Sequence, residues 1–89
     1  MNGYEQVIAD ALYCARLFRL GRDIEAALKM VEVIDVAVGL SDSCSAEYQA
    51  QLVHIMGTIL KCQERQDWIG VADWLEYELV ELCQSAVVG

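Results

Sequence analysis

The chain has 89 residues, which is enough for one small domain over residues 1–89 and too short for a second. Its net charge of −8, from 14 acidic and 6 basic residues, argues against nucleic acid or an anionic membrane as a partner. Hydrophobic residues make up 56% of the sequence, above the usual value of about 45–50%. This excess predicts a surface for self-association or for a protein partner.

The beginning of the chain and its cysteines predict a cellular compartment. The first residues, Met-Asn-Gly-Tyr-Glu, lack the basic start and apolar run of a signal peptide, and no stretch of about 18 uncharged apolar residues follows. We therefore expect a cytoplasmic protein that does not enter a membrane. In that reducing compartment Cys14, Cys44, Cys62 and Cys83 are expected to be free thiols that pack as small hydrophobic side chains. Their spacing lacks the close pairs of a zinc site, so no metal or other cofactor is expected.

Residues that typically end or begin a helix divide the chain into four predicted helices. Gly21 is a typical helix end, Asp23 and Asp67 are typical N-caps, and Gly39 begins a polar connection. No stretch alternates with the period of a strand. The predicted helices are residues 4–20, 23–38, 45–65 and 67–86. Because short connections make neighbouring helices antiparallel, we expect an all-α fold, a four-helix antiparallel bundle built from two helical hairpins.

The first two predicted helices differ in how their apolar residues are distributed. The first gathers them on one side, with Tyr4, Val7, Ile8, Ala11, Cys14, Ala15 and Phe18. The second is apolar nearly all round, and only Glu25, Lys29 and Glu32 mark a side that faces water. The second helix is therefore expected to be the most central of the four.

The third predicted helix carries two lines of residues. A broad apolar stripe is formed by Tyr48, Leu52, Ile55, Met56, Ile59 and Cys62, and a second line is formed by Ala46, Ala50, Val53 and Gly57. The small residues of the second line indicate either close packing inside the bundle or a helix-pairing seam between subunits. His54, the only histidine, lies on the polar side, where no serine or cysteine is placed to form a nucleophile–base pair.

The fourth predicted helix divides into an inner and an outer side. The inner stripe comprises Trp68, Val71, Ala72, Leu75, Leu79, Leu82 and Cys83. No basic residue follows Arg65, so the outer side is expected to be purely negative. Its carboxylates, Asp73, Glu76, Glu78 and Glu81, lack the Glu-x-x-His pattern of a di-metal helical site, which argues against metal chemistry.

The outer side of this helix is the predicted protein-interaction site. We expect Trp74, Tyr77 and Val80 to be its anchors, because aromatic residues are enriched where partners dock. The carboxylates of Asp73, Glu78 and Glu81 would favour a basic or amphipathic partner segment. The alternative is that the two aromatic rings cover neighbouring helices of the same chain.

Two segments resemble known families. The segment "VADWLEYELVEL" (residues 71–82) resembles an ending, AD-x-LEYEL, of small bacterial helical proteins, some associated with flagellar or related export genes. The short acidic helical build is also similar to flagellar and type III secretion export chaperones, and this resemblance implies a groove that holds a partner's helix. The segment "LFRLGRDIEAALKMVEVI" (residues 17–34) looks like the turn and second helix of a tetratricopeptide-type hairpin.

The functional prediction is a non-catalytic bacterial protein-interaction module, either an adaptor or an export-chaperone-like protein, that docks a partner helix or segment. The alternative is a purely structural, self-associating protein that forms an obligate homodimer. A small metal protein or enzyme is the least favoured class, because the sequence contains no catalytic constellation, metal-binding motif or phosphate-binding loop.

Overall fold

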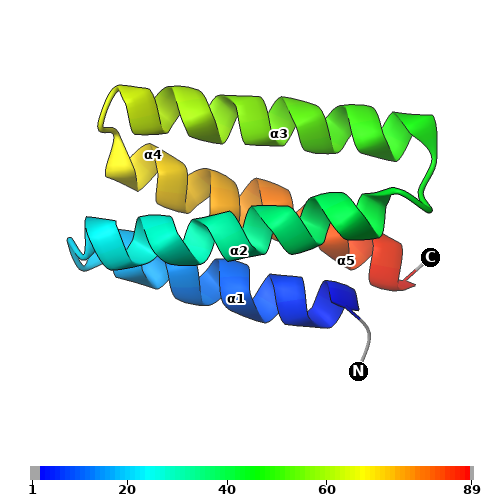
Figure 1. Cartoon of the computed structure of the whole chain (residues 1–89), viewed down its shortest axis with the longest axis horizontal. Helices are drawn as coiled ribbons and strands as arrows, with labels where there is room; N and C mark the ends of the chain where they lie inside the picture. The colour runs from blue at the N-terminus through cyan, green and yellow to red at the C-terminus, as the bar shows by residue number, and fades with distance from the viewer. Residues whose placement is uncertain (1–2, 89) are drawn as a thin grey trace.

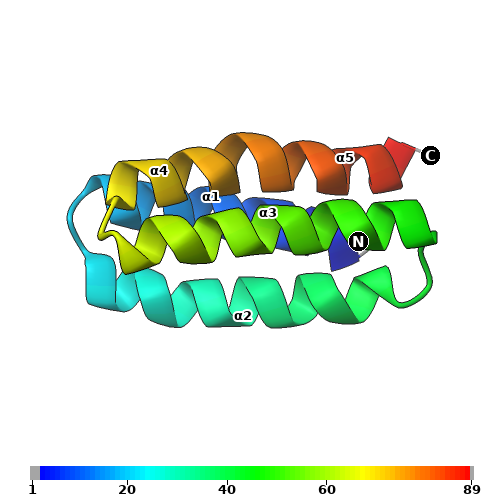
Figure 2. The same ribbon diagram turned by 90° about the horizontal axis from the view of Figure 1, so that it is seen from above.

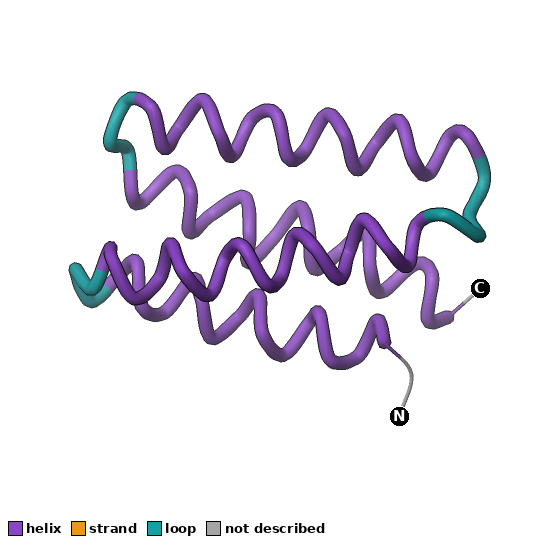
Figure 3. Tube along the Cα trace, viewed as in Figure 1, coloured by secondary structure: helices purple, strands orange, loops and turns teal. Residues whose placement is uncertain are grey.

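The computed structural model describes residues 3–88, and this part of the chain is all-helical, without a strand. The helices are α1 (Gly3–Arg19), α2 (Asp23–Ser41), α3 (Ala46–Glu64) and a last rod made of α4 (Trp68–Asp73), the π-helical segment η1 (Trp74–Leu79) and α5 (Val80–Val88). The four rods lie side by side, each antiparallel to the one before it (Figure 1). Short loops join them at the two ends (Figure 3). The all-α prediction is confirmed, and α2 runs three residues beyond its predicted end.

The turns after α1 and α3 have the same backbone geometry. After α1, Gly21 has φ +79° and the Arg22 N–H donates to the Leu17 carbonyl at 3.0 Å. After α3, Gln66 has φ +57° and the Asp67 N–H donates to the Cys62 carbonyl at 2.8 Å. Both are Schellman motifs, which place one residue in the left-handed region to satisfy the last helical carbonyls. Glycine adopts this conformation without steric cost, whereas glutamine does not.

The helix starts agree with the predicted caps in one case of two. The Asp67 carboxylate caps α4 by accepting a hydrogen bond from the Gly70 N–H at 3.0 Å. Asp23, also predicted as a cap, is the first residue of α2, and its acidic side chain lies in the first turn. The N-cap of α2 is Arg22, which makes no side-chain cap hydrogen bond. An acidic residue in the first turn still favours the helix, through the partial positive charge at the helix N-terminus.

The core lies between α1 and the other helices. The buried side chains of α1, namely Val7, Ala11, Cys14, Ala15, Leu17 and Phe18, meet both α2 and the whole length of the last rod. Figure 2 shows α2 at one edge of the molecule and the last rod at the opposite edge. Since α2 contacts α1 extensively and α3 only sparsely, α2 is a peripheral helix. The prediction that α2 is the most central helix is therefore wrong.

The π-helical segment changes which residues of the last rod face inward. All seven predicted inner residues are buried or pack against the core. Beyond them, Val80 is only 7% exposed, although its position in a regular α-helix predicts the outer side. A π-helix has wider turns than an α-helix, so each of its residues advances the side-chain direction by a smaller angle. Over the six residues of η1 the difference accumulates and turns Val80 toward the core.

We predict opposite effects of substitution at the two left-handed turn positions. Gln66→Gly is expected to raise the free energy of unfolding by about 1 kcal/mol, because glycine removes the steric cost of the positive φ. Gly21→Ala is expected to lower it by about the same amount for the converse reason. Urea unfolding measures both values. As a control, Gly39→Ala lies near the end of α2 in open space and should not destabilise the protein. A destabilised Gln66→Gly variant would contradict this account of the turn.

Candidate functional site

The predicted interaction face on the last rod is only partly available to a partner. The Trp74 ring is half-buried, packs against the core, and meets the His54 ring edge-on with centroids 6.0 Å apart. Val80 is buried and does not lie on this face, which corrects its predicted role as an anchor. Tyr77 is 61% exposed, and Glu78 and Glu81 are exposed. Of the three predicted anchors, therefore, only Tyr77 is exposed to a partner.

A basic residue from α1 changes the charge of this face. The Arg19 guanidinium lies 2.8 Å from Asp73 Oδ1 and 3.4 Å from Glu76 Oε2. The hydrogen bond to Asp73 raises the pKa of Arg19 above its already high usual value. The face is thus not purely negative, as the sequence of the last helix alone predicted. Because this ion pair is exposed to solvent, Arg19 changes the local charge more than it holds the fold together.

An apolar groove lies between α2 and α3. Its cavity volume is about 660 Å³, within the range of binding sites for ligands. We call it the α2–α3 groove and define it by its lining residues: Ile24, Ala27, Leu28, Met30, Val31, Ile34, Asp35 and Val38 from α2, and Leu60 and Gln63 from α3. The groove exists because α2 packs along α1 and leaves its side toward α3 largely uncovered.

The rim of the groove on α2 is a regular stripe of exposed residues. Ile24, Leu28, Val31, Asp35 and Val38 follow one another at steps of four, three, four and three residues. Ile24 is 77% exposed, Leu28 69% and Val31 66%, which are high values for side chains of this size and polarity. Steps of three and four are the spacing of the apolar seam of a coiled coil, which places residues in a line along one side of a helix. We call these five residues the α2 stripe.

The α2 stripe is the feature that the sequence analysis missed. The buried side of α2 is formed by Ala26, Met30, Val33 and Ala37, and the α2 stripe follows a separate line on the same helix. The apolar residues all round α2 predict a central helix only if its own chain buries every one of them. In the structure the chain buries one line and leaves the α2 stripe exposed. The heptad spacing of the second line was present in the sequence and could have identified it.

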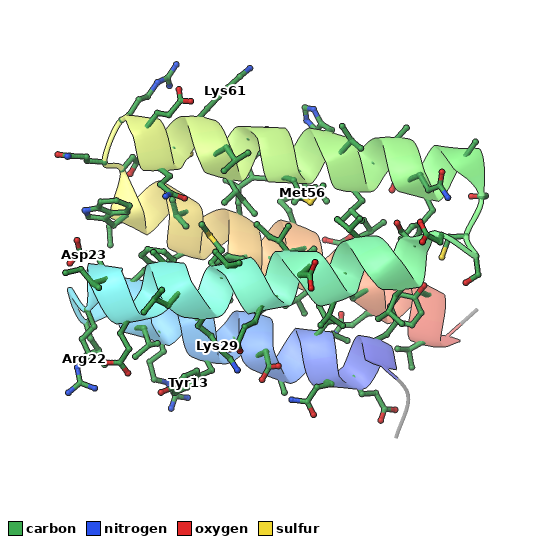
Figure 4. The ribbon with its side chains drawn as sticks, in the orientation of Figure 1. Tyr13, Arg22, Asp23, Lys29, Met56 and Lys61 are labelled. Atoms are coloured by element: carbon green, nitrogen blue, oxygen red, sulfur yellow. The ribbon has the colours of Figure 1, made fainter. Side chains whose placement is uncertain are left out.

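The line of small residues on α3 does not line the groove and faces solvent for most of its length. Ala46, Ala50 and Val53 are exposed, and a Cβ atom at Gly57 would meet nothing within 4 Å. Packing of this line inside the chain, one of the two alternatives given by the sequence, is therefore wrong. In Figure 4 Lys61 points away from the other helices, while Met56, which packs on the core, points inward from α3.

The cysteines are free thiols, and two of them are buried. The Cys14 thiol donates a hydrogen bond to the Ala26 carbonyl at 3.2 Å, and burial raises its pKa to about 12. Burial also raises the pKa of Cys83. Cys44 lies 2.8 Å from the Tyr4 hydroxyl. Burial thus explains Cys14 and Cys83 as packing residues, because the thiolate is the nucleophilic form and burial disfavours it.

Within residues 3–88 the histidine, cysteine and acidic side chains form no group of three or more that could hold a metal ion. No helix in this range is both long enough and apolar enough to cross a membrane. Comparison with protein-family models, with curated proteins and with solved structures gave no match.

We predict two classes of thiol reactivity in the native protein. At pH 8 a thiol whose pKa is about 12 has a thiolate fraction of about one in ten thousand, so Cys14 should not react. Cys83, which is buried with a raised pKa, should behave in the same way. The half-buried Cys44 and Cys62 should react first with DTNB, and all four should react in urea. Mass mapping of the modified peptides identifies the order, and early modification of Cys14 would contradict it.

Proposed function

We propose that this protein is a non-catalytic protein-interaction module that holds a partner helix in the α2–α3 groove. The observation that carries the proposal is the α2 stripe, a line of large exposed apolar side chains beside an open groove. Contiguous exposed apolar surface on a small protein is typical of an interaction site. The proposal includes the finer architecture, a four-helix antiparallel bundle of two hairpins that is open between its second and third helices. The sparse contact between α2 and α3 supports this architecture.

The dimensions and chemistry of the groove favour a helical occupant. The α2 stripe extends over 14 residue steps from Ile24 to Val38, or about 21 Å at the α-helical rise of about 1.5 Å per residue. A partner helix of about four turns would cover that length. Helices that dock in grooves present apolar residues at steps of three and four, which is the spacing that the α2 stripe itself offers.

The proposal keeps the predicted class of function and changes the surface that performs it. The outer face of the last rod offers Tyr77 as its only fully exposed aromatic ring within the described residues, whereas the α2–α3 groove offers a continuous apolar surface. An adaptor or export-chaperone-like role in the bacterial cytoplasm fits a groove that protects a partner's apolar helix. Four free thiols are suited to that reducing compartment.

Site-specific cross-linking tests the proposal. A photoreactive phenylalanine derivative placed at Leu28 or Val31 in the full chain is expected to cross-link, in cells that carry the native gene, to one segment with amphipathic helical spacing. The same group placed at Tyr13, an exposed ring of α1 outside the groove, is the control and should not cross-link to that segment. Cross-links to a common partner from Tyr77, with none from Leu28 or Val31, would assign docking to the last rod instead.

A matched pair of variants measures the energetic part of the same proposal. Val31→Asp should reduce binding of the cross-linked segment at least tenfold, because it places a charge in the apolar rim. Tyr13→Asp adds the same charge on α1 and should leave binding unchanged. Both side chains are exposed, so the two proteins should have similar circular dichroism and similar stability. Equal affinity of Val31→Asp and wild type would contradict the groove as the docking site.

A further inference from the structure

The α2 stripe contains one residue that is not apolar, and it restricts what can occupy the groove. Asp35 interrupts the line of Ile24, Leu28, Val31 and Val38 and lines the cavity with them. We propose that the occupant is a helix of a different protein that carries a lysine or arginine opposite Asp35, rather than a second copy of this chain. This inference rests on the proposed function, since it concerns the partner of the same groove.

Asp35 is available for such a contact. It is exposed, and no residue between 3 and 88 forms an ion pair or a side-chain hydrogen bond with it. The nearest basic residue of α2 in sequence, Lys29, is already engaged, 3.1 Å from Glu32 and 3.5 Å from Asp10. A helix that covers the stripe would remove the Asp35 carboxylate from water. An ionised carboxylate is costly to bury unless the partner supplies an opposite charge.

A second copy that docks its own α2 stripe would not supply that charge. In a parallel pair of α2 helices in register, Asp35 would face Asp35 of the other copy. In an antiparallel pair centred on Val31, Ile24 would face Val38, and Asp35 would face Leu28. Both arrangements bury the carboxylate without a counter-charge. Each copy also carries a net charge of −8, which adds long-range repulsion to the local mismatch.

The far wall of the groove offers a second polar group to the same occupant. Gln63 lines the cavity from α3, and its Oε1 atom is buried without a hydrogen-bond donor among the described residues. A buried acceptor without a donor is unfavourable, so an incoming donor would stabilise it. Lysine and arginine carry three and five N–H donors, respectively. Gln63 is near the end of α3, which lies beside the start of α2, so after a rotation of its side chain it would accept from a donor near one end of the partner helix, separate from the residue opposite Asp35.

The specificity can be measured with designed peptides and the full-length protein. Three helical peptides of about five turns share apolar residues at heptad spacing and differ only at the central seam position, which is lysine, leucine or glutamate. Fluorescence anisotropy of labelled peptides gives the affinities. For the wild type we expect the lysine peptide to bind most tightly and the glutamate peptide at least tenfold more weakly. High salt should reduce this difference, since it screens the ion pair.

Charge reversal on the protein provides the matched control. Asp35→Lys should invert the order, so that the glutamate peptide binds most tightly. Glu32→Lys makes the same change in net charge on the same helix, outside the groove lining, and should keep the wild-type order. Asp35→Leu should favour the leucine peptide and should also promote self-association, measured by sedimentation velocity, because it completes an apolar seam.

The outcomes separate failure of this inference from failure of the proposed function. Tight binding of all three peptides with equal affinity would overturn the charge preference and leave the groove as a helix-docking site. A wild-type dimer that dissociates on Val31→Asp would identify the occupant as a second copy and overturn the inference. A monomeric wild type that binds none of the peptides would overturn both the inference and the proposed function.

Discussion

The attachment of α2 mainly to α1, with only sparse contact to α3, is the constraint on which the rest of the structure depends. The Cys14 thiol reaches the Ala26 carbonyl, and both residues are fully buried. Small residues at such positions let two helices come close, and α1 then turns its remaining apolar surface toward the last rod. No helix of the described chain covers the other side of α2. The α2–α3 groove therefore forms because the core lies between α1 and the other helices, which leaves the side of α2 toward α3 uncovered.

The acidic residues of the last rod and of α2 differ in whether a basic residue pairs with them. Arg19, near the end of α1, forms ion pairs with Asp73 and Glu76, and these pairs join α1 to the last rod. Asp35 has no such neighbour on the open side. The acidic composition keeps a chain with much exposed apolar surface in solution, and it does so without placing charges across the apolar rim, except at this one position.

The sequence determines the fold class, the helix limits and the inner stripe of the last rod well, because these depend on local capping and on helical periodicity. The Asp67 cap and the seven residues of the inner stripe, from Trp68 to Cys83, illustrate this success. Val80 was misplaced because periodicity assumes an uninterrupted α-helix, and no residue of η1 signals the wider turn. The position of α2 was misplaced because an apolar side chain is the same in sequence whether it is covered by its own chain or by a partner. Only the heptad spacing of the α2 stripe, considered apart from the buried line of α2, indicates a second apolar surface.

The π-helical segment also has a consequence for how changes in chain length would act on this fold. A rod with one wide turn contains a residue more than a regular helix of the same height, so η1 stores a register offset between α4 and α5. Loss of a single residue there would let the rod straighten into one continuous α-helix without breaking it. Because the shortened segment would have the same height and nearly the same angular advance as the wide turn, the half of the rod beyond the deletion would keep its core and surface side chains where they are. The fold should thus tolerate the loss of one residue in this segment better than in α4 or α5, where each residue lost would turn the rest of the rod by about 100°.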